Sequence, residues 1–202
     1  MDTHKLQLKI YLTPDSARTL DVETLVPVFH RWIKQRALPE LTIDVANYRH
    51  VPEGPGVVLI GHGSDYFLDE GEGRPGLLHN RKRPGLPPAE RLADLARRTL
   101  HAAALLEKDL ALTGKVKFAT NELLFRVNDR LAAPNSDATL AALRPELEAL
   151  CKTLFAGPFE IVREGGPKEL FAVRIKSPAS APLATLLERA GGPPTADASL
   201  VA

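Results

Sequence analysis

The residues best suited to chemistry gather in one stretch of the chain, between positions 56 and 83. Imidazole, carboxylate, hydroxyl and guanidinium groups alternate there with three short apolar runs, and one further histidine precedes them. The candidate cluster for a ligand or a metal comprises His50, His62, Asp65, Tyr66, His79, Arg81 and Arg83. Histidines with a carboxylate can coordinate a divalent metal, or act as a general base with its orienting partner. Arginines beside them can hold a small anion.

The predicted strand pairing brings part of this cluster together. Two chain reversals, the first at Gly63-Ser64, would fold the stretch into a three-stranded meander. Tyr66 then lies opposite Gly61 on one side and His79 on the other, with His62 at the adjacent corner. In this arrangement His62 and His79 are the expected ligands of any divalent metal. The alternative interpretation is that Gly-His-Gly-Ser-Asp is turn chemistry and that His62 is solvated.

A short segment of this stretch is similar to a known family. The run VVLIGHGS, residues 57–64, resembles the strand-plus-GHGS segment of the small cobalt and nickel chelatases of tetrapyrrole synthesis. The resemblance covers eight residues and implies that His62 contacts a metal ion. In that family the segment opens a parallel sheet and a helix follows it, whereas residues 66–68 here are predicted to be a strand. The chain has neither a G-x-S-x-G elbow nor a phosphate-binding glycine loop.

Composition argues against several classes of protein. The 202 residues carry 26 basic and 25 acidic side chains, and this balance argues against a dedicated DNA-binding protein. A single cysteine, Cys151, excludes an internal disulfide and a cysteine-built zinc site. The N-terminus lacks the pattern of a signal peptide, and no apolar run approaches the roughly 20 residues that span a bilayer. We therefore expect a soluble, cytoplasmic protein that binds neither DNA nor a membrane.

The pattern of apolar residues predicts an α+β fold. Alternation at 6–12 and 41–45 predicts half-buried strands, and helical stripes predict three principal helices near 23–37, 88–112 and 137–155. The other apolar runs predict short strands, among them 57–60, 66–68, 115–118, 122–127, 159–162 and 170–175. Because short turns join most strands, we expect a mainly antiparallel or mixed sheet with the helices packed on one face. A likeness between residues 121–127 and 168–174 indicates a weak internal helix–strand–strand duplication.

The expected domain organisation is simple. Residues 1–177 are predicted to form a single α+β domain, with a candidate sub-boundary in the proline-rich segment 84–88. Residues 178–202 are predicted to form a short helix near 182–189 and a loose tail. The residues expected in the core are Leu8, Ile10, Phe29, Ile43, Leu59, Leu95, Leu106, Leu147, Leu150 and Ile175.

Two functions from different classes fit these features. The first is a non-catalytic binding or assembly protein that is homo-oligomeric through an exposed sheet edge. Its ligand is undetermined, and a small anion is one candidate. The second is a histidine-dependent metal-binding protein or enzyme, with a chelatase-like or lyase-like site centred on His62. The lack of a complete catalytic motif favours the first. The sequence leaves open the ligand, the oligomeric state and whether the protein is an enzyme.

Overall fold

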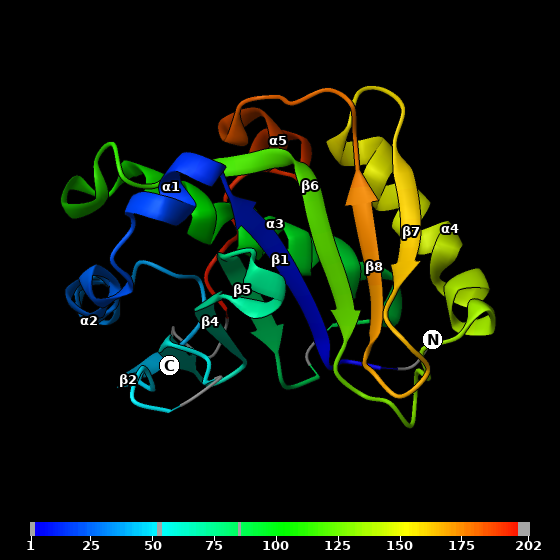
Figure 1. Cartoon of the computed structure of the whole chain (residues 1–202), viewed down its shortest axis with the longest axis horizontal. Coiled ribbons are helices and arrows are strands. Elements are labelled where there is room, and N and C mark those ends of the chain that lie inside the picture. The colour runs from blue at the N-terminus through cyan, green and yellow to red at the C-terminus, as the bar shows by residue number, and fades with distance from the viewer. Residues whose placement is uncertain (1–2, 52–53, 85, 198–202) are drawn as a thin grey trace.

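One antiparallel sheet forms the frame of the molecule. The computed structural model describes residues 3–51, 54–84 and 86–197, and its eight strands follow the order β2-β3-β4-β5-β1-β6-β8-β7 (Figure 1). Every neighbouring pair is antiparallel, which confirms the predicted α+β class. The strands are β1 Leu6–Leu12, β2 Thr42–Asn47, β3 Val57–Gly61, β4 Ser64–Asp69, β5 Gly76–Arg81, β6 Phe118–Val127, β7 Glu160–Glu164 and β8 Phe171–Lys176.

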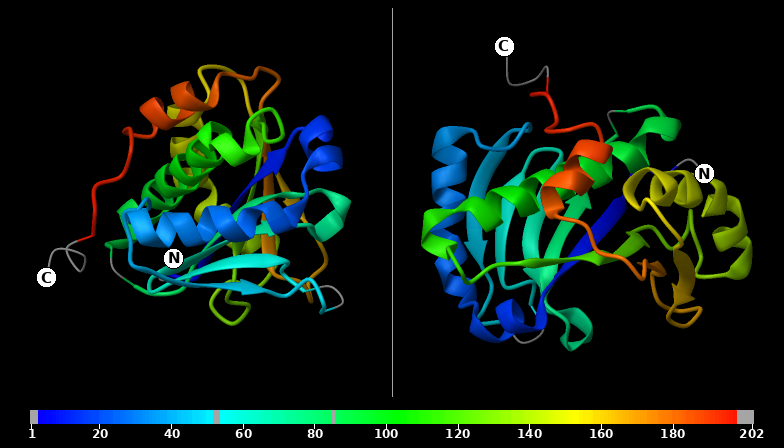
Figure 2. Two further views of the ribbon diagram at one scale, coloured as in Figure 1. Left: turned by 90° about the vertical axis from the view of Figure 1, so that its left-hand side faces the viewer. Right: turned by 90° about the horizontal axis from the view of Figure 1, so that it is seen from above.

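The longer helices and the last, short one lie on one face of this sheet, and the first short helix lies at the end of β1 (Figure 2). The α-helices are α1 Pro14–Thr19, α2 Leu25–Gln35, α3 Pro88–Lys108, α4 Asp137–Leu154 and α5 Leu183–Arg189. Three short 3-10 turns are η1 Val22–Thr24, η2 Gly71–Gly73 and η3 Leu110–Leu112. The three principal helices expected from the sequence are confirmed as α2, α3 and α4. No helix in the described ranges is long and apolar enough to cross a membrane.

The central helix α3 packs on the strands that carry the site. Pro88 begins it, because a proline in the first turn gives up no helical hydrogen bond. Its apolar side packs against β1 and β5. It ends at Lys108, earlier than the predicted 112, because Asp109 is extended and its side chain accepts a hydrogen bond from Ala111 N to start η3.

Strand β1 is buried on both faces, although its alternation predicted a half-buried strand. Leu8 and Ile10 point into the core below the helices. Lys9 and Tyr11 point to the other face, where they are 0% and 1% exposed. The 3-10 turn η2 and Arg74 cover them there: Lys9 Nζ donates to Gly71 O, and the Arg74 guanidinium lies 4.0 Å from the centre of the Tyr11 ring.

Other local predictions need correction. Nine of the ten expected core residues are buried, but Ile43 is 56% exposed. A register shift between Thr42 and Asp44 reverses the alternation of β2, so that Thr42 points inward instead. The turn expected at residues 13–16 is the start of α1, where the Thr13 side chain caps Ser16 N.

Two strands were expected at 115–118 and 122–127, but residues 115–117 are not in a strand, and residues 118–127 form the single strand β6. The first of the two similar helix–strand–strand units therefore contains only one strand. The two similar segments instead pair with each other in the sheet, where Leu124 of β6 lies opposite Arg174 of β8.

One hydrophobic cluster fills the space between the sheet and the helices. It runs from β1 through α2, α3 and α4 to the leucines of α5, Leu183, Leu186 and Leu187. The short helix predicted near 182–189 is thus present, and it packs on this core. The proline-rich segment 84–88 joins β5 to α3, and these two elements pack against each other.

Candidate functional site

A cavity of about 770 Å³ lies where the β3–β4 hairpin, the first half of α3 and the segment after α5 meet. We call it the α3 pocket. A volume of this size suits a small molecule, because ligand sites typically enclose about 300–1,000 Å³. Leu41, Leu86, Ala89 and Ala93 supply apolar wall. The charged and imidazole groups that line it are Glu40, His62, Arg81, Arg83, Glu90, Asp94, Arg97, Arg98 and Asp197.

Asp94 organises the arginines of the α3 pocket. Its carboxylate accepts hydrogen bonds from Arg81 Nη1 at 2.7 Å, Arg98 Nε at 2.8 Å and Arg97 Nη2 at 3.2 Å. Arg97 and Arg98 follow Asp94 at the i+3 and i+4 positions of α3, which share one helix face. Burial acts to raise the pKa of Asp94, but the Arg98 and Arg81 guanidinium groups lower it below its usual value. An ionised carboxylate therefore holds three guanidinium groups in fixed orientations.

Two of the arginines that line the cavity have guanidinium groups that carboxylates do not fully engage. The Nε atom of Arg97 is buried and has no hydrogen-bond partner among the described residues. Arg83 lies on the exposed rim, where its Nη1 is 2.9 Å from His62 Nε2. A guanidinium group only donates, so His62 accepts at Nε2 in this arrangement. Arg98, with a side chain only 10% exposed, directs its two outer nitrogens at the Asp197 carboxylate.

A buried carboxyl group forms part of the wall. Glu40 is 4% exposed and accepts a hydrogen bond from the Tyr66 hydroxyl at 2.6 Å. Burial raises the pKa of Glu40, against the hydrogen bond from Tyr66 and the charge of Arg98, which lower it. A buried carboxyl group with a raised pKa beside a cavity is a candidate for proton exchange. The sequence offered one signal for it, a lone acid in the otherwise apolar run ALPELTI.

Gly61 and Gly63, on either side of His62, lie where a larger side chain would meet neighbouring atoms. A side chain at Gly61 would place its Cβ 2.5 Å from Ser64 O, and one at Gly63 would lie 3.3 Å from Glu40 Oε2. The hairpin therefore needs small residues to close over Glu40. The chelatase resemblance does not extend to the fold, because β3 belongs to an antiparallel sheet and the strand β4, not a helix, follows it.

The structure brings three of the seven sequence-predicted residues to the α3 pocket, namely His62, Arg81 and Arg83. Tyr66 and His79 lie behind the pocket, inside the core. Their rings stack at 4.4 Å with an angle of 8° between the planes. His79 is fully buried, with Nδ1 3.2 Å from Thr99 Oγ1. Burial lowers its pKa from 6.5 to about 3, so its ring is neutral.

The register within the meander was partly predicted. Tyr66 does pair with His79, as expected, and His62 does lie at the adjacent corner. The residue opposite Tyr66 on the other side is Leu59 instead of Gly61. The difference arises because Ile60 pairs with Asp65, so that four residues, 61–64, separate the two members of the last β3–β4 pair, where two were expected.

The other two predicted residues lie away from the α3 pocket. Asp65 points to the opposite face of the sheet, because side chains alternate along β4, and its carboxylate pairs with Lys82 at 2.7 Å. His50 lies in the turn between β2 and β3, at the far end of β3 from His62. With a rise of about 3.3 Å per residue, the two ends of β3 are about 13 Å apart. In the described part of the chain, no three His, Cys, Asp or Glu side chains are grouped to hold a metal ion.

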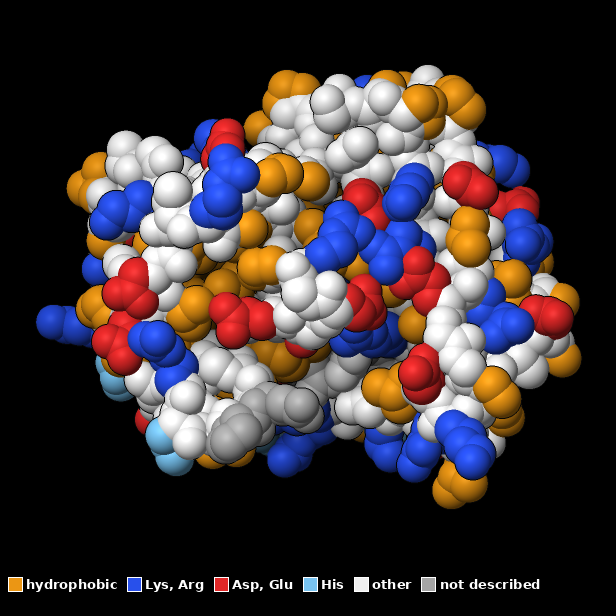
Figure 3. Space-filling model, in the orientation of Figure 1, with side chains coloured by type: hydrophobic (Ala, Val, Ile, Leu, Met, Phe, Trp, Pro, Cys, Tyr) orange, Lys and Arg blue, Asp and Glu red, His pale blue; other side chains and the backbone are white. Residues whose placement is uncertain are grey.

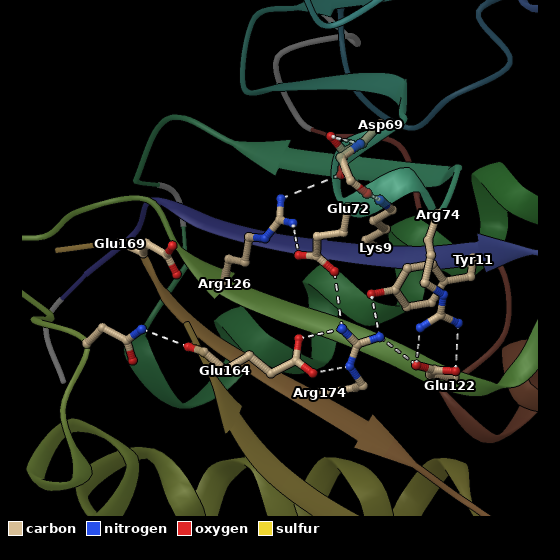
Figure 4. A network of polar contacts seen from close by, with 12 residues as sticks. Lys9, Tyr11, Asp69, Glu72, Arg74, Glu122, Arg126, Glu164, Glu169 and Arg174 are labelled. Carbon is tan, nitrogen blue, oxygen red and sulfur yellow. Dashed lines mark hydrogen bonds and ion pairs between the residues drawn. The ribbon is translucent and has the colours of Figure 1, made fainter. Parts of the chain in front are cut away.

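A second group of charged residues covers the sheet face opposite the helices (Figure 3). We call it the open-face network, and Figure 4 shows its members: Lys9, Tyr11, Asp69, Glu72, Arg74, Glu122, Arg126, Glu164 and Arg174. Arg174 donates to Glu122, Glu164 and Glu72. Arg74 binds Glu122 through two hydrogen bonds, of 2.7 and 2.9 Å. The hydrogen bonds from Arg74 lower the pKa of Glu122 to about 2, although burial acts against them.

The remaining charged groups of the open-face network also pair with one another. Lys9 is completely buried and pairs with Asp69 at 2.7 Å, and Arg126 pairs with Glu72 at 3.1 Å. Sequence reasoning missed this group, whose only signal is a set of polar residues at alternate positions of β1, β6 and β8.

Comparisons with protein-family models, with curated proteins and with solved structures found no match to this chain.

Proposed function

We propose that this chain is a binding protein that holds a small anionic ligand in the α3 pocket. One observation carries the proposal: Arg97 lines a cavity of about 770 Å³, and its buried Nε lacks a partner in the described structure. Buried polar groups are almost always hydrogen-bonded, so such an atom calls for an acceptor. A ligand oxygen in the pocket would supply that acceptor. Asp94 holds the guanidinium in place beforehand, which reduces the cost of binding.

Arg83 and His62 would complete the ligand site at the rim. Guanidinium groups match carboxylate or phosphate oxygens in pairs, and His62, whose Nε2 accepts from Arg83, can donate through Nδ1. This arrangement favours an anion over the alternative, a metal or catalytic site centred on His62. The Arg83 Nη1 atom lies 2.9 Å from His62 Nε2. A metal ion bound at Nε2 would therefore lie close to the Arg83 guanidinium, and the two positive charges would repel each other.

Isothermal titration calorimetry with succinate, citrate and inorganic phosphate at constant ionic strength tests the proposal. We expect Arg97→Met to weaken binding by about tenfold or more while leaving the thermal unfolding midpoint nearly unchanged. The matched control is Arg144→Met on α4, whose side chain is 45% exposed and pairs only with Glu148 among the described residues. Equal affinity of Arg97→Met and the wild type would contradict the proposal.

We also propose that the protein self-associates through β2, an edge strand of the sheet. Leu41 and Ile43 beside its outer edge are 45% and 56% exposed. The other edge strand, β7, carries Glu160, Arg163 and Glu164, and such charges discourage pairing with a second sheet. A second copy of the chain could therefore extend the sheet at β2 with fewer charges to desolvate.

Light scattering after size exclusion tests self-association. We expect the wild type to be a dimer or larger, and Ile43→Lys to be monomeric. Val162→Lys, which places the same charge on β7, should not change the mass. A monomeric wild type at high micromolar concentration would contradict the proposal.

A reducing, cytoplasmic setting is part of the same proposal. Cys151, the chain's single cysteine, is a free buried thiol, and burial raises its pKa to about 12. Such a thiol is not reactive. Because a single cysteine forms no internal disulfide, the stability of the protein does not depend on an oxidising compartment.

A further inference from the structure

The segment after α5 reaches the α3 pocket as an extended chain. Gly191 and Gly192 have φ angles of +98° and +75°, a conformation that favours glycine and turns the chain away from α5. Figure 2 shows the segment, in red, leaving α5 without forming a helix or strand. Thr195, Ala196 and Asp197 then line the pocket. The tail expected to be loose is thus fixed to the body of the protein as far as residue 197, and residues 198–202 lie outside the described structure.

A single residue attaches this segment. Asp197 N donates to Pro39 O at 2.7 Å. Its two carboxylate oxygens accept from Arg98 Nη2 at 2.5 Å and from Arg98 Nη1 at 3.3 Å. Within the described structure, residues 193–196 make no hydrogen bond to the rest of the chain. Release of the Asp197 contacts would therefore free the whole segment.

The Asp197 contact has the geometry of a bound carboxylate ligand. Two guanidinium nitrogens face two carboxylate oxygens, which is the paired arrangement that arginine forms with carboxylates. The guanidinium belongs to a rigid site, because Asp94 fixes Arg98 Nε and the Arg98 side chain is only 10% exposed. The Asp197 side chain is 38% exposed, so solvent reaches it. A carboxylate from solution could take its place without a change in the Arg98–Asp94 contact.

We infer that Asp197 stands where the carboxylate of the ligand binds, so that segment 193–197 is an internal competitor for the α3 pocket. This inference rests on the proposed function and narrows the ligand to a carboxylate. A ligand with two acidic groups fits best, with one group on Arg98 and the other reaching Arg97 and Arg83. Because the segment must leave first, the apparent affinity is the intrinsic affinity reduced by the fraction of open molecules.

Titration of Asp197→Asn with succinate tests the inference. Asparagine keeps the size and the backbone contact but removes the charge that holds Arg98. We expect succinate to bind about tenfold more tightly than to the wild type, which corresponds to about 1.4 kcal/mol. The uncharged analogue succinamide should show no such gain, and inorganic phosphate a smaller one. The control is Asp15→Asn on α1, where the side chain is 88% exposed and lies far from the pocket lining.

The outcomes separate the two proposals. If Asp197→Asn binds succinate equally or more weakly and the wild type binds it clearly, segment 193–197 is not a competitor for the pocket. The proposed anion-binding function would be unaffected by this result. No succinate binding by either protein, with both shown to be folded by circular dichroism, would overturn both. An equal gain for succinate and phosphate would overturn the assignment of a carboxylate.

Discussion

The α3 pocket and the open-face network lie on opposite faces of the sheet and contain the same kinds of side chain. In the network, the carboxylates match the cations: Arg174 alone donates to Glu72, Glu122 and Glu164. In the pocket, three arginines share the carboxylate of Asp94, and Arg83 contacts a histidine. Charge density is therefore a poor sign of a ligand site. The pocket lining also has equal numbers of arginines and carboxyl groups. The better sign is an arginine beside a cavity with a donor that no carboxylate engages, such as Arg97 Nε.

If this contrast is right, the largest loss of stability should come from the network. Arg174→Met would leave three carboxylates without their shared partner. Removing one member of a fully buried ion pair costs about 3–5 kcal/mol. The Arg174 side chain is 14% exposed, so we expect a smaller loss, about 2–3 kcal/mol, in urea unfolding. Arg83→Met at the pocket rim should change the free energy of unfolding by less than about 0.5 kcal/mol. Similar losses in the free energy of unfolding for the two variants would contradict the contrast between a stabilising network and a ligand pocket.

Acid should weaken the network as well. The pKa of Glu122 in the folded protein is about 2, compared with 4.5 for a free glutamate. Its contribution to stability is therefore complete above about pH 4.5 and is lost as the pH falls toward 2. We expect the difference in free energy of unfolding between the wild type and Glu122→Gln to shrink over that range. A difference that is constant from pH 5 to pH 2 would mean that Arg74 and Arg174 do not stabilise the ionised form.

A small effect at neutral pH is expected at His79, which distinguishes a core residue from a site residue. Its Nε2 is buried without a partner in the described structure. His79→Phe keeps an aromatic ring against Tyr66, so the free energy of unfolding at pH 7 should change by less than about 1.5 kcal/mol. Succinate binding should be unchanged. Loss of binding with normal stability would show that His79 serves the pocket.

The same variant has a pH signature. The pKa of His79 in the folded protein is about 3, whereas that of a free histidine is 6.5. Between these values the unfolded chain binds a proton that the folded chain does not, so the wild type loses stability as the pH falls. His79→Phe removes this term and should gain stability relative to the wild type below about pH 6. A parallel pH dependence of the two proteins would show that His79 is protonated when folded.

The sequence predicted the parts of the fold that depend on local pattern. The three long helices and the antiparallel sheet follow from apolar spacing, which burial enforces. The exposed Ile43 was mispredicted because a bulge in β2 changes the face of each residue without altering the local alternation. Arg98 on α3 is only 8% exposed, because its guanidinium pairs with Asp197 from a distant part of the chain.

The site was predicted only in part for a related reason. The residues Arg81, Arg83 and His62 lie within one meander, whose register follows from nearby turns. Glu40 and Asp197 come to the pocket from distant parts of the chain, and no local sequence pattern predicts such contacts. His79 was predicted as a ligand because its imidazole lies opposite Tyr66, whereas its place on the helix face of β5 buries it completely.

One experiment tests the central claim most directly: succinate titration and urea unfolding of two arginine variants in parallel. Arg97→Met removes a donor from the α3 pocket, and Arg74→Met removes one from the open-face network. We predict that Arg97→Met loses at least about tenfold in affinity and keeps its stability, whereas Arg74→Met keeps its affinity and is destabilised. Unchanged affinity in Arg97→Met, or a loss of affinity in Arg74→Met at full folding, would contradict the assignment of ligand binding to the α3 pocket.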